Sequence, residues 1–157
     1  MPLSKAKSEA EVLAAVRAYT QRGVHSTSEA RKFLTDRGTD EARLAGLICV
    51  LEKEGLLDDR ACARLCAEHW ARADYGTPVI QARLSEKGLD DSTIADALLR
   101  LNETESDEDR ARGWLARRGR SNASVRTLAR QLLGRGFERA LIARLLKLPE
   151  EETELSE

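Results

Sequence analysis

Three glycines, Gly38, Gly88 and Gly136, set the organisation of this chain, because they lie 50 and 48 residues apart and share their surroundings. Each follows a basic residue, and each has a leucine four positions before it and apolar residues six and ten positions after it. The matching columns are Arg37, Lys87 and Arg135; Leu34, Leu84 and Leu132; Leu44, Ile94 and Ile142; and Ile48, Leu98 and Leu146. A repeat of this period predicts an array of similar helical units.

Each column has a physical reason in a helical unit. A leucine one turn before a helix end packs inward, and a base near the C-terminus suits the helix dipole. Glycine takes the left-handed position that stops a helix. Apolar residues four apart then line one face of the next helix.

Helix starts fit the same frame. Ser26 and Glu29 form a capping box, and Thr77 before Pro78 predicts a cap followed by proline at the first helical position. Candidate caps also stand at Asp40, Asp59, Asp90 and Ser124. These signals predict helices over 8–22, 27–37, 40–54, 59–73, 78–87, 91–101, 106–118, 123–135 and 138–147.

We therefore expect an all-α fold of three tandem three-helix repeats in an elongated array that allows curvature. The repeats would span 1–57, 58–101 and 102–148, followed by an acidic tail over 149–157. The alternative is one globular bundle of nine helices. The register that holds in several columns favours the array.

Charge is unevenly distributed along the chain. Residues 110–148 carry 11 basic side chains and one acidic one, between acidic stretches over 102–109 and 149–157. Such a block attracts polyanions or acidic protein surfaces, although an ordinary solvated face is the alternative. The candidate partner-binding residues are Arg117, Arg118, Arg120, Arg126, Arg130 and Arg135.

Four other features have plainer interpretations. Asp58 and Asp59 fit a helix start better than a metal or acid–base site. Cys62, Cys66 and His69 share a helix face and could bind zinc, but a buried stripe is favoured. We expect His25 to be an exposed residue at a helix entry. The scattered aromatic residues favour core packing over a stacking platform for single strands.

The sequence contains no glycine-rich phosphate loop, nucleophile motif or metal-ligand set. We therefore expect no catalytic residues, no enzyme activity, no cofactor, no metal and no small-molecule substrate. The start of the chain is polar and no apolar run approaches the length of a membrane span, so we expect a cytoplasmic protein.

Several motifs together resemble the RecX family, regulators of the RecA recombinase, over residues 12–147. They are Gly55-Leu56-Leu57-Asp58-Asp59 with Ala61 and Ala63; Gly76 with Ile80, Leu84 and Lys87-Gly88-Leu89; Leu132 with Arg135-Gly136-Phe137 and Ile142; and Arg22, His25, Ser26 and Glu29 with Leu34 and Arg37-Gly38.

The resemblance implies a fold of three three-helix units without cofactor or active site. It also implies binding to RecA and to the RecA–single-stranded DNA filament, in the filament groove, with suppression of recombinase, ATPase and co-protease activities. Two alternatives stay open: a helical nucleic-acid-binding protein that uses its basic third repeat, and a helical scaffold for another protein. Direct DNA binding would be weak for a RecA regulator, and strong and salt-dependent for the nucleic-acid-binding protein.

Overall fold

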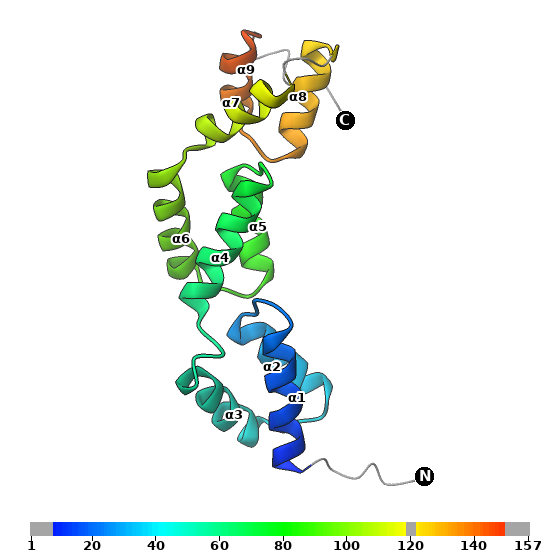
Figure 1. Cartoon of the computed structure of the whole chain (residues 1–157), viewed down its shortest axis with the longest axis vertical. Coiled ribbons are helices and arrows are strands. Elements are labelled where there is room, and N and C mark those ends of the chain that lie inside the picture. The colour runs from blue at the N-terminus through cyan, green and yellow to red at the C-terminus, as the bar shows by residue number, and fades with distance from the viewer. Residues whose placement is uncertain (1–7, 119–121, 150–157) are drawn as a thin grey trace, which may run out of the picture.

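The computed structural model describes residues 8–118 and 122–149, which form helices and no strand (Figure 1). The predicted all-α class is confirmed, and every predicted helix is present with ends within three residues of those expected. The helices are α1 Glu9–Gln21, α2 Thr27–Asp36, α3 Glu41–Lys53, α4 Asp59–Arg72, α5 Thr77–Glu86, α6 Asp91–Thr104, α7 Asp107–Arg118, α8 Val125–Gly134 and α9 Arg139–Leu146.

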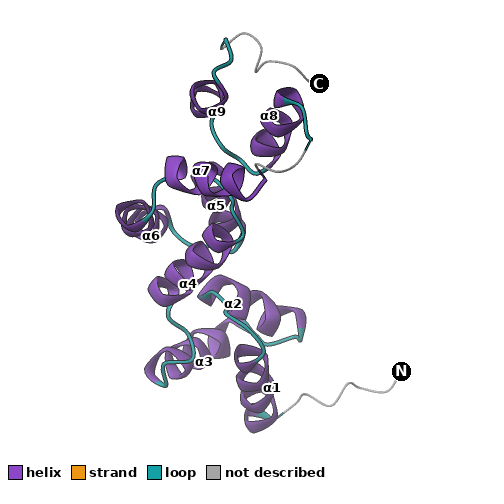
Figure 2. Ribbon diagram, turned by 45° about the horizontal axis from the view of Figure 1, so that its top comes forward, coloured by secondary structure: helices purple, strands orange, loops and turns teal. Residues whose placement is uncertain are grey.

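The buried apolar residues fall into three clusters rather than one. The first lies within α1–α3, the second within α4–α6 and the third within α7–α9, and we call these triplets the first, second and third units. The units follow one another along the long axis, which gives an elongated molecule (Figures 1 and 2). The repeat boundaries drawn from the sequence stay predictions.

Side-chain caps explain where most helices begin. Ser26 accepts the Glu29 N–H while the Glu29 carboxylate accepts the Ser26 N–H, which is the predicted capping box. Further caps, each accepting the N–H three residues on, are Ser8, Asp40, Asp58, Asp90 and Ser124. Such caps satisfy N–H groups that the helix itself leaves free.

Two predicted caps were wrong by one residue. Asp58 rather than Asp59 caps α4, and Asp59 is its first helical residue, which confirms that this pair marks a helix start. Gly76 precedes α5, and Thr77 is its first residue. The Thr77 hydroxyl instead donates to Asp107 Oδ1 at 2.6 Å, so it is engaged by the third unit rather than by its own helix.

Within the described ranges, none of the helices combines the length and the apolar character that crossing a bilayer requires.

Candidate interaction surface and the joints between units

The middle helices of the three units meet end to end, and we call each such contact a joint. At the first joint, the Ser26 hydroxyl at the start of α2 donates to the carbonyl of Lys87 at the end of α5. At the second, the Gly76 N–H at the start of α5 donates to the carbonyl of Arg135 at the end of α8, at 2.8 Å. Ser26 and Gly76 occupy the same position of the repeat, as do Lys87 and Arg135, so both joints are formed by equivalent residues.

A carboxylate of the following unit closes each joint. Asp59 Oδ1, at the start of α4, accepts the N–H of Thr27 at 2.8 Å. Asp107 Oδ1, at the start of α7, accepts the N–H of Thr77 at 3.0 Å. In both cases the first residue of one unit caps the first residue of the neighbouring middle helix, where a negative charge is favourable.

Two of the repeated glycines lie inside these joints. A β-carbon at Gly88 would collide with the Ser28 side chain, and one at Gly136 would collide with that of Val79. Around Gly38, by contrast, nothing lies within 4 Å of the same position. All three have positive φ, so glycine serves helix termination in each unit and close approach in two of them.

An ion pair crosses the first joint, between Lys87 Nζ and Glu29 Oε1 at 2.9 Å. Burial opposes ionisation of Glu29, but the hydrogen bonds from Lys87 and from the Ser26 N–H hold its pKa below the usual value. Burial likewise opposes the charge on Lys87, while the Glu29 carboxylate raises the pKa of the ammonium. Both groups are therefore charged at neutral pH.

A buried arginine holds the second joint. Arg110 is 1% exposed. Its guanidinium donates to the carbonyls of Tyr75 at 3.1 Å and Glu105 at 2.8 Å, and to Asp107 and the Thr77 hydroxyl. Its inclusion in the basic block as surface charge was wrong, because this network uses its donors inside the molecule.

The candidate partner-binding residues divide into two groups. Arg117 pairs with Asp74, and Arg135 donates to the Ala73 carbonyl at 2.6 Å. These two reach back to the second unit and contribute to the joint. Arg118, Arg126 and Arg130 are exposed, and Arg120 lies outside the described residues. Nothing in the structure tests their role in binding.

Acidic neighbours neutralise part of the block. Glu108 pairs with Arg112 at 2.6 Å and with Arg144 at 2.7 Å, and these partners hold the Glu108 pKa below its usual value. Within the described part of the third unit, the exposed bases without an ion pair are Arg118, Arg126, Arg130, Arg139 and Lys147. The positive surface therefore lies mainly on and beside α8 and α9.

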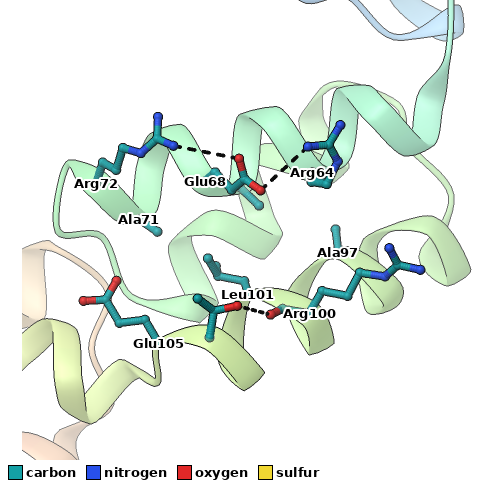
Figure 3. A pocket seen from close by; sticks show the side chains of 10 residues that line it. Arg64, Glu68, Ala71, Arg72, Ala97, Arg100, Leu101 and Glu105 are labelled. Atoms are coloured by element: carbon teal, nitrogen blue, oxygen red, sulfur yellow. Dashed lines mark hydrogen bonds and ion pairs between the residues drawn. The ribbon is translucent and has the colours of Figure 1, made fainter.

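A groove of ≈ 360 Å³ between α4 and α6 was not predicted (Figure 3). Ala67, Ala71 and Ala97 line it together with Leu101, and their small side chains leave the space open. Its charged rim includes Glu68, which lies 3.9 Å from Arg64 and 4.0 Å from Arg72, together with Arg100 and Glu105. The sequence feature that could have indicated this groove is the row of alanines spaced four residues apart on α4.

The candidate zinc ligands, His25 and the aromatic residues serve mainly in packing. Cys62 is buried and Cys66 packs against the same core, while His69 is exposed. The expectation of an exposed His25 was wrong, because its ring stacks on Tyr19 with centroids 3.9 Å apart and its Nδ1 is buried. The described aromatic residues pack in or against the cores, as expected: Phe33, Trp70, Tyr75, Trp114 and Phe137 directly and Tyr19 by stacking on Phe33.

Known proteins resemble this chain in sequence. The Regulatory protein RecX of Amycolatopsis mediterranei is 32% identical over 154 residues, which cover 91% of this chain and 82% of that protein. The chain belongs to the RecX family. No family model matches it.

The RecX proteins of Chlorobaculum tepidum and Halalkalibacterium halodurans are 35% and 30% identical over 82 and 131 residues. These matches cover 52% and 79% of this chain but 51% and 48% of the two relatives, so the chain spans about half their length. The crystal structure of RecX from Lactobacillus salivarius superposes with a TM-score of 0.70 at 22% identity, covering 88% of this chain and 94% of that one. The latter match establishes that the RecX fold is shared.

Proposed function

We propose that this RecX-family chain is a regulatory protein that binds RecA and the RecA–single-stranded DNA filament. It would restrain the recombinase, ATPase and co-protease activities of RecA in the cytoplasm, by binding and without catalysis. The observation that carries this proposal is the match over 91% of the chain to a protein named as a regulator.

The shape and charge of the chain support the same proposal. Stacked units present a long surface, which suits contact with several neighbouring subunits of a helical filament. The exposed Arg118, Arg126 and Arg130 provide donors for carboxylates or phosphates on such a filament. We place the partner surface on these residues, together with Arg117, Arg120 and Arg135.

The test is ATP hydrolysis by the cognate RecA on single-stranded DNA, with this protein added below stoichiometry. A progressive fall in rate supports the proposal. The triple variant Arg118→Glu, Arg126→Glu and Arg130→Glu should lose most of the inhibition while keeping its helicity. The matched control reverses three exposed arginines of the first unit, Arg22, Arg31 and Arg43, and should inhibit nearly as well.

An alternative function is direct nucleic-acid binding through the third unit, favoured by Arg126 and Arg130 one turn apart on α8. It requires tight binding to single-stranded DNA without RecA, with a steep loss as salt rises. An unchanged RecA rate at stoichiometric excess, combined with salt-sensitive DNA binding, would replace the RecA proposal with this one. A different partner in a pulldown, with neither effect, would indicate a scaffold.

A further inference from the structure

The middle helices form a column in which all three point the same way. The end of α8 abuts the start of α5, and the end of α5 abuts the start of α2 (Figures 1 and 2). The dipoles are therefore aligned head to tail, with each C-terminus against an N-terminus of opposite partial charge. Two ends of the column stay uncovered by the described residues: the start of α8 and the end of α2.

The uncovered start of α8 has the same construction as the starts that lie inside joints. Its cap Ser124 follows Ser26 and Gly76 at the same spacings of 50 and 48 residues that separate the repeated glycines. The next residue, Val125, corresponds to Thr27 and Thr77, whose N–H groups are bound by Asp59 and Asp107. Val125 is 44% exposed, so much of its side chain is free to contact another surface.

The uncovered end of α2 is the matching half. Glu9 is the first residue of α1, as Asp59 is of α4 and Asp107 is of α7, again 50 and 48 residues apart. Arg37 corresponds to Lys87 and Arg135, whose carbonyls accept the joint hydrogen bonds. Gly38 has open space where Gly88 and Gly136 face the neighbouring unit.

We infer that a second copy of this chain docks head to tail on the first, with α8 of one copy on α2 of the other. The partner's Ser124 hydroxyl would donate to the Arg37 carbonyl, its Val125 N–H would donate to Glu9, and the start of its α8 would pack on Gly38. The occupant is a second copy because this contact continues a joint that the chain already makes twice, and because both halves of the joint lie on one chain.

Such a contact joins two different surfaces, so it does not close on itself. A head-to-tail interface produces open chains, whereas a two-fold interface stops at a dimer. One joint is also small, which makes the association weak and dependent on concentration.

The test is sedimentation velocity of the whole chain over a wide concentration range. The weight-average mass should rise above the monomer value of 17.4 kDa without levelling off at twice that value. Gly38→Asn should keep the protein monomeric, because asparagine tolerates positive φ but fills the space that the partner needs. The control is Gly55→Asn, at another glycine with positive φ and open surroundings, which should associate like the wild type.

A second variant blocks the other surface of the proposed contact, which is the start of α8. Val125→Pro keeps α8 intact, because proline is favoured in the first turn of a helix, but it removes the N–H that would donate to Glu9. Each blocked variant alone should stay monomeric, and an equimolar mixture should form dimers and nothing larger, because one free half of each kind remains. A wild type that is monomeric throughout, or a mixture that stays monomeric, would overturn the inference, as would equal association of Gly38→Asn and wild type.

Discussion

Asp107 accepts the backbone N–H of Thr77 with both carboxylate oxygens, at 3.0 and 3.1 Å, and so caps a helix of the neighbouring unit rather than its own. The same carboxylate binds the buried Arg110. One acidic side chain therefore connects a backbone amide of the second unit to a guanidinium of the third. The strength of this joint depends on the charge balance between the two side chains.

Replacing Arg110 with methionine should destabilise the protein by about 3–5 kcal/mol. The change removes the donor to the Tyr75 and Glu105 carbonyls and leaves the Asp107 carboxylate without its opposite charge, and breaking a buried pair on one side carries this cost. The measurement is urea-induced unfolding followed by circular dichroism. Arg112→Met is the control, because its pair with Glu108 is exposed and should contribute less than about 1 kcal/mol. Equal losses from both variants would contradict the role of Arg110.

Alanine at Gly136 should destabilise the protein more than alanine at Gly38, by about 1–3 kcal/mol. Both glycines have positive φ, 87° and 83°, so the cost of backbone strain is shared. Only the methyl group at Gly136 meets the Val79 side chain, and overpacking of this kind carries the additional cost. Thermal or urea denaturation of the two variants measures the difference. Equal stabilities would show that the second joint opens to accept the methyl group.

The stabilising effect of Glu29 should disappear in acid. Its pKa is lower in the folded protein than in the unfolded chain, so its contribution is complete above the unfolded value of roughly 4.3. It is lost as the pH falls through the lower, folded value. The difference in unfolding free energy between wild type and Glu29→Gln should thus be largest near neutral pH and shrink below about pH 4. A difference that is constant with pH would exclude the Lys87 pair as its source.

Cys66 should react with iodoacetamide at a lower pH than an ordinary thiol. The hydrogen bond from Cys62 lowers the Cys66 pKa to about 7, with Lys87 adding to the effect against burial. The reaction is best measured in a Cys49→Ser background, because Cys49 is exposed. The rate should be half-maximal near a pH of about 7, and Cys62→Ala should move the midpoint toward about 8.5. Identical pH profiles for the two proteins would contradict this assignment.

The helices could be predicted from the sequence because their caps are local. Ser26 and Glu29 stand three residues apart, and the leucine and glycine that end each middle helix stand four apart, so short windows contain the signal. The joints connect residues further apart, such as Ser26 and Lys87, and no local pattern pairs them. Thr77 illustrates the difference. Its place before Pro78 predicted a helix cap, but its contacts with the distant Asp107 make it part of a joint.

The candidate site could be predicted only in part. Arg126 and Arg130 are exposed as charged residues usually are, whereas Arg110 is buried. Arg110 lies 48 residues after the buried Cys62, so the repeat register itself indicated a buried position that its charge concealed. The groove beside Ala67 and Ala97 depends on how two helices pack, which a single sequence does not specify.

The joints are made largely by main-chain groups, by glycines and by the acidic residue that begins the following unit. One whole period of the sequence therefore contains all the groups that a unit needs to form its joints. A tandem duplication of 48 or 50 residues would insert one unit with both of its contacts intact. A duplication that is not a whole number of periods would leave a donor facing no acceptor. The gene for such a protein can therefore grow or shrink in whole steps, and each step changes the length of the molecule by one unit.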